Sequence, residues 1–490
     1  MNRPTRETAR LRAADKAHLW HPFTQMAEWA AGESVVIAEG DREFLIDTDG
    51  CRYVDGTSSL WCNLHGHRRR EIDEAVAAQL GRIAHSTLLG LASPPSIELA
   101  ARLIAIAPRA AWATDALRSA DADVRAARGA YAPRAAGDTG SRGGLTRVFY
   151  SDSGATAVEI ALKMAFQYWR QCPRPEPRRT KFVSLSLGYH GDTIGAVSVG
   201  GIDLFHNLYR PLLFEPIRAP SPYCYRCPLG LRREDCGMAC AERVEEILAG
   251  HAAEVAAVIV EPLVQGAGGM ITHPAGYLAR VAAACLRHNV LLICDEVATG
   301  FGRTGRMFAC EHEGVRPDLM CLAKGISGGY LPLAATLATE RIYEAFLGKT
   351  EESRTFFHGH TYTGNALACA AGLASLDIFE KEHVLDRIGR LAEMLAERLR
   401  PAAAMDHVGQ VRQRGLMVGI ELVADRATRQ PYPAAERRGW RVCLAARKHG
   451  VWIRPLGDVV VLMPPYCISD DSLARLTEAL RQSIAEVTEA

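Results

Sequence analysis

Residues 289–296, NVLLICDE, and residues 318–332, DLMCLAKGISGGYLP, decide the fold of this chain. Each stretch contains a short apolar run that leads to a charged side chain, Asp295 in the first and Lys324 in the second. Further runs of this kind, separated by longer helical patterns, are RVFY (147–150), KFVSLS (181–186) and EVAAVIVEP (254–262). Such alternation predicts an α/β protein with a mainly parallel sheet that helices cover on both faces.

The length and the two chain ends predict a two-domain subunit. At 490 residues the chain is too long for one compact core. We expect a large domain over residues 76–384 and a smaller α+β domain built from residues 1–75 and 385–490. Within the last range, VWIRPL (451–456) and DVVVLMP (458–464) read as paired strands that precede a helix. The apolar residues at helical spacing are Leu473, Leu476, Leu480, Ile484 and Val487.

One segment of the large domain, residues 109–144, differs in composition from its surroundings. It is rich in Ala, Arg, Asp and Gly and contains few large apolar side chains. Such a segment buries too little apolar surface to form a core of its own. We interpret it as an exposed insertion with at most a short helix.

Composition argues against several classes of partner. The chain has 57 basic and 56 acidic residues, so its charges nearly cancel. A chain with almost no net charge does not attract nucleic acid or an anionic membrane surface. Residues 1–20 are charged throughout, and no apolar run reaches the roughly 18 residues that span a bilayer. Most of the 14 cysteines, such as Cys294 and Cys321, lie in apolar runs, so disulfides are not expected. We therefore expect a cytoplasmic protein that acts on small molecules.

Lys324 and Asp295 are the first candidates for chemistry. Ligands of parallel sheets gather at the carboxyl ends of strands, and both residues follow apolar strands. A partly desolvated lysine there can form a Schiff base with an aldehyde cofactor. A carboxylate there can keep a pyridine nitrogen protonated. Taken singly, each has an ordinary alternative: Lys324 as a solvated loop residue and Asp295 as a helix cap.

A turn that can hold a phosphate is predicted in RVFYSDSGATAVEIALKMAFQYW (147–169). Ser153, Gly154 and Ala155 lie where a strand ends and a helix begins. Free backbone N–H groups and the helix dipole favour an anion at such a turn. Strand–turn–helix units of this kind are common, so the motif alone has low specificity.

A candidate ring-stacking residue lies in GYHGDTIGAVSVGG (188–201), which places Tyr189 and Asp192 in a glycine-containing loop after a strand. A flat aromatic side chain at this point can stack on a cofactor ring. The alternative is an aromatic residue that only packs in the core.

In this order and spacing, together with IVEPLVQGAGGM (259–270), these segments resemble the class III aminotransferases, which are pyridoxal-phosphate enzymes of fold type I. The resemblance implies that Lys324 binds the cofactor covalently and that Asp295 is the partner of its pyridine nitrogen. It also implies roles for the turn and the loop. The phosphate would be held by Ser153 and Gly154 beside Ala155, with Tyr189 stacked on the ring.

A further implication of the resemblance is a shared active site. Thr361, in HGHTYTGN (358–365), is similar to the residue that reaches the phosphate from the neighbouring subunit. The resemblance therefore implies a homodimer.

A narrower resemblance covers nearly the whole chain. The segments that carry it are HLWHPFTQM (18–26), DGTSSLWCNLHGH (55–67), AHSTLLG (84–90), GYHGDT (188–193) and VWIRPLGDVVVLMPP (451–465). They resemble the members of the family that act in biotin biosynthesis and transfer an amino group to 8-amino-7-oxononanoate. By this resemblance Arg454 grips the substrate carboxylate. The substrate-binding residues would be Phe23, Trp61, Tyr189, Asp192, Gly359 and Arg454.

Two other functions remain open at this point. One is another class III transaminase that acts on an ω-amino acid or a diamine. The other is a non-catalytic regulator that binds a metal or cofactor. The motifs at both chain ends argue against the first, and the Asp295–Lys324 pair argues against the second.

Departures from the family pattern concern the amino donor. Where the enzymes that use S-adenosylmethionine commonly have Tyr, this chain has Phe23, and where they commonly have Pro, it has His360. Ala155 replaces a serine and removes one hydroxyl from the phosphate site. Some members of the family resemble lysine-using enzymes instead, and three segments of this chain resemble that branch more closely. The donor is therefore S-adenosylmethionine or lysine, and we expect lysine to be at least competent.

A cysteine motif lies outside this scheme. PYCYRCPLGLRREDCGMAC (222–240) contains Cys224, Cys227, Cys236 and Cys240 in a C-x2-C-x8-C-x3-C pattern. Four thiolates at short spacing can bind zinc or an iron–sulfur cluster. The spacing matches no familiar zinc module, so we favour the alternative of free thiols in a surface excursion.

Overall fold

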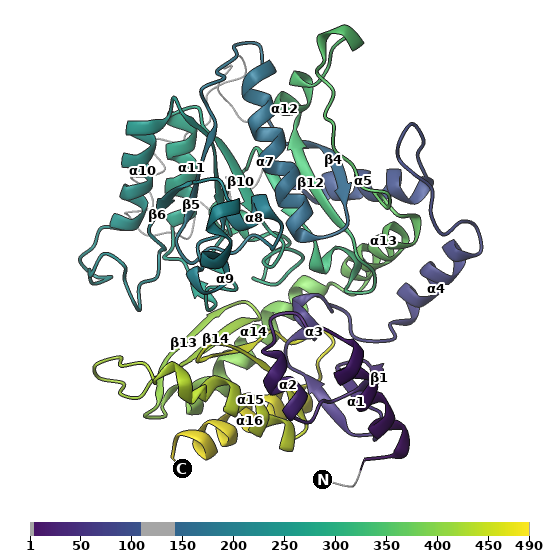
Figure 1. Cartoon of the computed structure of the whole chain (residues 1–490), viewed down its shortest axis with the longest axis vertical. Helices are drawn as coiled ribbons and strands as arrows, with labels where there is room; N and C mark the ends of the chain where they lie inside the picture. Colours follow the sequence, from purple (N-terminus) through teal and green to yellow (C-terminus); the bar gives the residue numbers. More distant parts are fainter. Residues whose placement is uncertain (1–3, 109–142, 490) are drawn as a thin grey trace.

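The computed structural model describes residues 4–108 and 143–489 of the chain (Figure 1). An upper part surrounds the largest sheet, and a lower part contains both chain ends. The predicted insertion at 109–144 lies outside the described residues except for Gly143 and Gly144.

A mixed sheet forms the centre of the upper part. In the described chain its seven strands follow the order β4-β12-β11-β10-β7-β5-β6. The strand β12 is antiparallel to both of its neighbours, whereas the pairs from β11 to β6 are parallel. The strands are β4 (Leu145–Ser151), β12 (Ala334–Thr339), β11 (Leu319–Leu322), β10 (Leu291–Asp295), β7 (Val255–Val260), β5 (Lys181–Leu185) and β6 (Ile217–Ala219). The mainly parallel sheet predicted from the sequence is confirmed.

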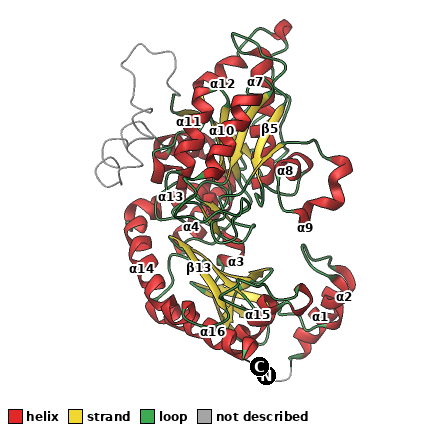
Figure 2. Cartoon of the chain, turned by 90° about the vertical axis from the view of Figure 1, so that its left-hand side faces the viewer, coloured by secondary structure: helices red, strands yellow, loops and turns green. Residues whose placement is uncertain are grey.

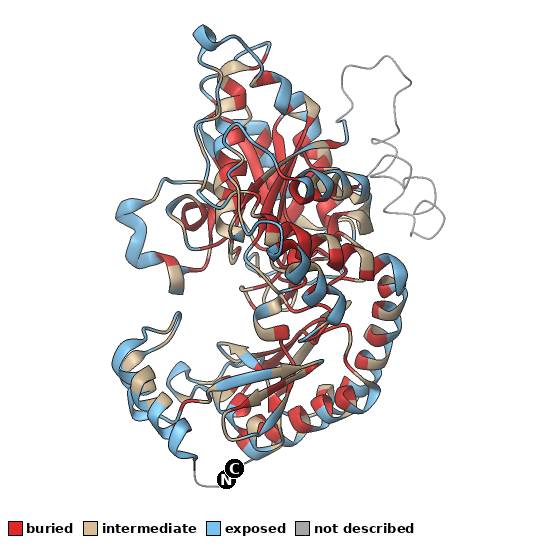
Figure 3. Ribbon diagram, turned by 90° about the vertical axis from the view of Figure 1, so that its right-hand side faces the viewer, coloured by how far each residue is buried: buried red, intermediate tan, exposed pale blue. Residues whose placement is uncertain are grey.

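Both faces of this sheet are buried, which explains why its strands are continuous apolar runs. Along β10, Leu291 and Ile293 face one apolar cluster, and Leu292 and Cys294 face the other. Helix α7 (Gly154–Gln171) supplies much of the first cluster, and α11 (Tyr277–Arg287) and α13 (Ala366–Lys381) belong to the second. Figure 3 shows the sheet strands as the most continuously buried part of the molecule.

The remaining elements of the upper part surround these layers. Its other helices are α4 (Arg70–Leu80), α5 (Pro94–Ile106), α8 (Ile194–Val199), α9 (Asp203–His206), α10 (Ala239–His251) and α12 (Glu340–Ala345). A short hairpin joins β8 (Val264–Gln265) and β9 (Ile271–Thr272).

The lower part combines the two ends of the chain. One sheet has the order β1-β2-β3-β15 and the other the order β13-β14-β17-β16. The C-terminal strand β15 pairs in parallel with β3 from the N-terminal region, and β16 pairs with β17 as the sequence predicts. The strands are β1 (Ile37–Asp41), β2 (Phe44–Asp47), β3 (Arg52–Asp55), β13 (Val408–Arg414), β14 (Met417–Leu422), β15 (Val451–Trp452), β16 (Arg454–Leu456) and β17 (Val459–Leu462).

Helices cover these two sheets. The predicted C-terminal helix is α16 (Asp470–Thr488), and all five of its predicted apolar residues are buried. The other helices of the lower part are α1 (Arg6–His18), α2 (Met26–Ala31), α3 (Ser58–Trp61), α14 (Val384–Ala403) and α15 (Arg438–Lys448). Among the helices of residues 4–108 and 143–489, none is both long and apolar enough to cross a membrane.

Candidate active site

The candidate site lies where β10 and β11 end side by side. Asp295 is the last residue of β10, and it pairs with Cys321 of the parallel strand β11. The strand β11 ends at Leu322, and Lys324 begins the short 3-10 helix Lys324–Ser327. Both charged residues therefore lie at the carboxyl edge of the sheet, where α/β proteins bind ligands.

Lys324 is held in a strained and desolvated setting. Its φ of 41° lies in the left-handed region, which residues other than glycine rarely adopt. Burial lowers the pKa of its amine, and the neighbouring carboxylates of Asp295 and Glu261 offset only part of this effect. Its Nζ lies 5.3 Å from the centre of the Trp61 ring. A lysine whose neutral form is favoured in this way can act as a nucleophile and as a proton carrier.

The carboxylate of Asp295 is fixed on both oxygens. Oδ2 lies 2.7 Å from Nδ1 of His190, and Oδ1 accepts the backbone N–H of Val297 at 3.1 Å. Asp295 is only 3% exposed and His190 only 4%. A buried carboxylate that cannot rotate freely is suited to hold the proton of a pyridine nitrogen.

A second buried carboxylate, Glu261, follows β7. Its Oε1 accepts the backbone N–H of Tyr189 at 2.9 Å, and its Oε2 accepts that of Gly266 at 2.8 Å. Burial raises the pKa of Glu261 to about 7; His190 opposes the rise, and Asp295 contributes to it. Glu261 therefore ties the loop of Tyr189 to the turn at Gly266.

The turn between β4 and α7 can hold a phosphate. Ser153 caps α7 with its side chain, and Gly154 and Ala155 belong to the first turn, where backbone N–H groups lack helical partners. A Cβ at Gly154 would lie 2.6 Å from Cγ1 of Val297, and a Cβ at Gly191 would lie 2.4 Å from Cβ of Ala155. Because only glycine fits at these two positions, the turn packs directly against the loops that follow β10 and β5.

Trp61 ends a strained segment that follows β3. Ser58, Ser59 and Trp61 all have positive φ. Asp55 holds this segment, because its Oδ2 accepts the backbone N–H of Ser59 at 2.7 Å. A Cβ at Gly266 would lie 3.3 Å from the Trp61 ring. The indole is thus held between the turn at Gly266 and the candidate lysine.

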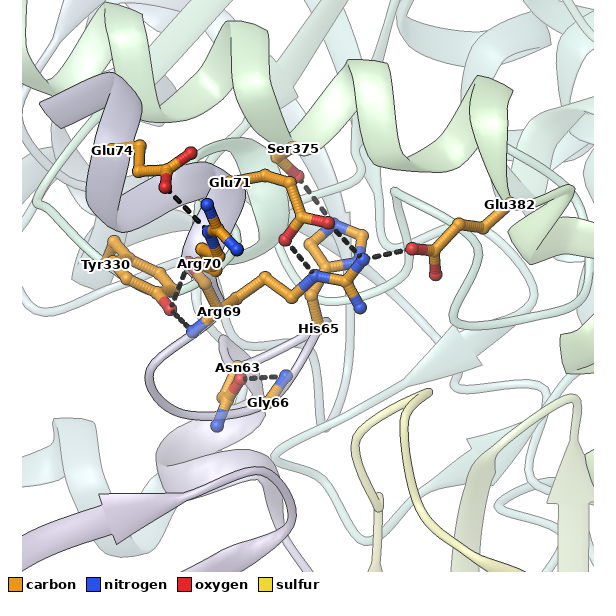
Figure 4. A network of polar contacts seen from close by, with 10 residues as sticks. All are labelled: Asn63, His65, Gly66, Arg69, Arg70, Glu71, Glu74, Tyr330, Ser375 and Glu382. Carbon is orange, nitrogen blue, oxygen red and sulfur yellow. Dashed lines mark hydrogen bonds and ion pairs between the residues drawn. The ribbon is translucent and has the colours of Figure 1, made fainter. Parts of the chain in front are cut away.

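A polar network supports the chain that follows Trp61 (Figure 4). Nε2 of His65 lies 2.9 Å from Oγ of Ser375, which belongs to α13. The backbone N–H of Arg69 donates to the hydroxyl of Tyr330. Because Tyr330 lies in the loop after the candidate lysine, the network joins the Trp61 segment to that loop.

In Tyr189, the candidate stacking residue, both the backbone N–H and the side-chain hydroxyl are held by hydrogen bonds. Its backbone is held by Glu261, and its hydroxyl donates to Oδ2 of Asp192 at 2.8 Å. Burial raises the pKa of Tyr189, and the hydrogen bond to Asp192 raises it further. The phenol is therefore protonated at neutral pH, and its one O–H is donated to Asp192.

Comparison with known proteins identifies the family. The family model described as aminotransferase class III matches residues 26–484. The chain belongs to the class III aminotransferases. One relative, the adenosylmethionine-8-amino-7-oxononanoate aminotransferase of Nitratidesulfovibrio vulgaris, is 57% identical over 482 residues, which cover 98% of this chain and 83% of the relative.

Solved structures of transaminases share the fold. The adenosylmethionine-8-amino-7-oxononanoate aminotransferase of Methanocaldococcus jannaschii is 44% identical, with a TM-score of 0.85 and coverage of 98% of this chain and 99% of that one. An amine transaminase from an uncultivated Pseudomonas species, solved with bound pyridoxal phosphate, is 39% identical, with a TM-score of 0.84 and coverage of 96% and 99%. The predicted α/β architecture of fold type I is confirmed.

The site of this aminotransferase fits pyridoxal phosphate, the cofactor of the family. Lys324 offers a desolvated amine for the aldehyde, and Asp295 offers a fixed carboxylate for the ring nitrogen. The helix turn at Gly154 offers backbone N–H groups at the positive end of the α7 dipole, where a phosphate can bind.

Three predicted site residues of this aminotransferase, Gly359, Thr361 and Arg454, are exposed. Gly359 and Thr361 are exposed on the loop before α13, where the carbonyl of Thr361 accepts a hydrogen bond from His85 at 2.8 Å. Arg454 is the exposed first residue of β16 and pairs with Val461. Among the described residues, no hydrogen bond or ion pair joins these three to the lysine region.

The four cysteines of the 222–240 segment do not form a preformed metal site. Within residues 4–108 and 143–489, no group of three or more His, Cys, Asp or Glu side chains is arranged to hold a metal ion. Burial raises the pKa of Cys240 to about 11, and a nearby Cys224 thiolate would raise it further. The Cys240 thiol is therefore protonated at neutral pH.

Sequence reasoning missed His190, Glu261 and Phe205. Glu261 ends an apolar strand just as Asp295 does, so the same signal was present in EVAAVIVEP. His190 and Phe205 carried no comparable signal. Their contacts with Asp295, Tyr189 and Phe23 form only in the folded chain, where these segments meet.

Proposed function

We propose that this enzyme transfers an amino group to 8-amino-7-oxononanoate and so forms 7,8-diaminononanoate for biotin biosynthesis. The observation that carries the proposal is the identity of 57%, over 98% of the chain, to a relative named for that reaction. The motifs at residues 18–26 and 451–465 support it, because they lie outside the segments of this chain that we assign to the cofactor.

Different residues of this chain would have different roles in the amino transfer. Pyridoxal phosphate, when bound, supplies an electron sink for the carbon that carries the amine. Lys324 would hold the cofactor, and its Nζ, whose pKa is lowered by burial, would then move a proton from that carbon to the cofactor. Asp295 would hold the proton on the ring nitrogen, with His190 keeping its carboxylate in place. Trp61 and Tyr189 would exclude water from the reacting atoms.

We further propose that Arg454 binds the terminal carboxylate of the oxononanoate substrate. The guanidinium is exposed on β16, so it is free to make a bidentate contact with an incoming anion. The remaining predicted contacts of the substrate are Phe23, Asp192 and Gly359.

For the amino donor, we propose that lysine is competent alongside or in place of S-adenosylmethionine. Phe23 lacks the tyrosine hydroxyl of the S-adenosylmethionine enzymes, so it cannot make that hydrogen bond to the donor. Nδ1 of His360 lies 3.0 Å from Oδ2 of Asp152, so this region carries polar and charged groups in place of an apolar ring. Such groups suit the distal ammonium of lysine.

We also propose a homodimer in which Thr361 completes the phosphate site of the neighbouring subunit. The loop that carries Thr361 packs on the AHSTLLG segment, since the rings of His85 and Tyr362 lie 4.8 Å apart. Several large apolar side chains in and directly beside these two segments are exposed. They are Leu89, Leu91, Phe357 and Tyr362.

The experiment supplies the purified holoenzyme with 8-amino-7-oxononanoate and one donor at a time, and quantifies 7,8-diaminononanoate by mass spectrometry. Product with S-adenosylmethionine or lysine is expected, and Lys324→Ala should give none. Product with S-adenosylmethionine and none with lysine would overturn the donor proposal alone. No product with either donor, from an enzyme that aminates ω-oxo acids, would instead establish the alternative transaminase.

A further inference from the structure

Four rings connect the N-terminal segment to the candidate site. Phe23, three residues before α2, packs edge-to-face against Phe205 of α9, with ring centroids 5.3 Å apart. Phe205 packs edge-to-face against Tyr189 at 6.3 Å, and Tyr189 lies parallel to His206 at 6.4 Å. Figure 2 shows α9 at the lower edge of the upper part, facing the segment that leads into α2. We call Phe23, Phe205, Tyr189 and His206 the aromatic bridge.

The α9 end of the bridge is firmly anchored by His206. This side chain is buried, and its Nδ1 accepts the backbone N–H of Ile202 at 3.2 Å. A Cβ at Gly200 would lie 2.3 Å from Cε1 of His206, so the ring lies directly on the backbone there. Burial lowers the pKa of His206, and Arg218 lowers it further, which keeps the ring neutral at neutral pH. Because the adjacent residue His206 is fixed, the position of Phe205 is restricted as well.

The Phe23 end is weakly held by comparison. Phe23 is 64% exposed, and its φ of 51° is in the left-handed region. A residue with a side chain adopts that conformation at a cost in free energy, which other contacts must offset. Within the described residues, Phe205 is the one aromatic partner of Phe23. The position of Phe23 therefore depends on Phe205.

We propose that Phe205 is a specificity-determining residue for the amino donor, because its ring packs between those of Phe23 and Tyr189. The inference rests on the proposed function only in treating Phe23 and Tyr189 as donor-facing side chains. A donor that carries an aromatic base, such as S-adenosylmethionine, gains from a fixed aromatic wall. Lysine offers only an alkyl chain and an ammonium. Loss of Phe205 therefore weakens binding of the first donor more than binding of the second.

The test compares Phe205→Ala and Leu204→Ala holoenzymes with the wild type. Leu204 lies on the same turn and is 88% exposed, so its variant is the matched control. The apparent Kd of each donor is measured from the cofactor absorbance change without an acceptor. A donor that does not react is measured as an inhibitor of the one that does. Phe205→Ala should raise the ratio of the Kd for S-adenosylmethionine to that for lysine by roughly two- to tenfold, and Leu204→Ala should not.

A double-variant cycle tests whether Phe205 acts on the donor through Phe23. Once Phe205 is removed, Phe23→Ala should have no further effect on the ratio, because the two rings act as one unit. Additive effects of the two substitutions would contradict the proposal. If Phe205→Ala fails to fold, Phe205→Met keeps the volume without the ring and serves in its place.

A second readout does not depend on the reaction. Hydrogen exchange of residues 19–25 in the full-length, cofactor-free enzyme should become faster in Phe205→Ala and stay unchanged in Leu204→Ala. An unchanged Kd ratio would overturn the proposal, whether or not exchange became faster. If the wild type accepts neither donor, the proposed function fails, and unaltered exchange in Phe205→Ala would separately refute the bridge.

Discussion

At the residue scale, the site contains two buried carboxylates with different partners. Asp295 faces the ring of His190, whereas Glu261 accepts two backbone N–H groups. Different surroundings give two carboxylates different roles. Asp295 is suited to a charged partner on the cofactor, and Glu261 is suited to positioning Tyr189 and the turn at Gly266.

The role of Asp295 gives the first prediction. Asp295→Asn keeps the size of the side chain but removes the charge that would hold a proton on the ring nitrogen. The lysine-bound cofactor should still absorb in the visible region, while turnover falls by on the order of a hundredfold or more. Steady-state kinetics and an absorbance spectrum of the same preparation check this. Near wild-type turnover with bound cofactor would refute the role.

The second prediction concerns the pH dependence of stability. Burial raises the pKa of Glu261 from an ordinary 4.5 to about 7. Its contribution to the free energy of unfolding is therefore complete below about pH 4.5 and is lost as the pH rises through 7. Between these limits the wild type should lose stability relative to Glu261→Gln, which cannot titrate. Thermal unfolding of the cofactor-free proteins across this range measures the difference, and a difference independent of pH would refute the assignment.

At the scale of elements, the predictable features were those encoded in single runs of sequence. Strands β4, β5, β7 and β10 and helix α16 follow from uninterrupted apolar runs or helical spacing, and Asp295 and Lys324 follow from strand ends. The antiparallel direction of β12 was not predictable, because it depends on which strands pair. The aromatic bridge was not predictable either, since it joins loops about 180 residues apart in sequence. The domain limits at residues 75 and 385 remain predictions.

The cysteine-containing segment 222–240 is held to the lower part by a buried ion-pair network. Glu421 of β14 accepts hydrogen bonds from Tyr223, Arg226 and Arg412, and Arg412 also donates to the carbonyl of Gly269 at 2.7 Å. This network joins the segment, the turn after β8 and the C-terminal sheet. The segment is therefore attached to the C-terminal sheet through buried charge pairing.

The third prediction follows from that network. Glu421→Ala leaves the buried Arg412 without its carboxylate, so the free energy of unfolding should fall by about 3–5 kcal/mol. Cys227→Ser should change it by less than about 1 kcal/mol. Urea unfolding measures both, and metal analysis of the wild type accompanies it. A large loss in Cys227→Ser together with about one equivalent of bound metal would show instead that the cysteines bind a metal.

At the scale of the whole molecule, the proposed dimer gives the fourth prediction. Leu89 is 89% exposed on the AHSTLLG segment, which contacts the loop of Thr361. Leu89→Asp places a charge on that apolar surface, so it should shift the enzyme toward monomers and lower its activity. Leu231→Asp, at a partly exposed position in the cysteine segment, is the control and should do neither. Sedimentation velocity measures the state, and full activity from a monomer would refute the shared site.

At the scale of the whole molecule, both the upper and the lower part contribute residues to the surroundings of Lys324. The sheet edge supplies Asp295 and Lys324, the helix turn at Gly154 supplies N–H groups, and the N-terminal region supplies Trp61. The central claim is that these features converge on Lys324 as the residue that binds the cofactor.

Borohydride reduction of the holoenzyme, followed by peptide mapping with mass spectrometry, tests that claim most directly. Reduction makes the bond between the lysine and the cofactor permanent, so the modified residue can be read from the fragment masses. The reduced cofactor should be found on the peptide containing Lys324 and on no other lysine. A cofactor adduct on a different lysine, in enzyme that was active before reduction, would contradict it.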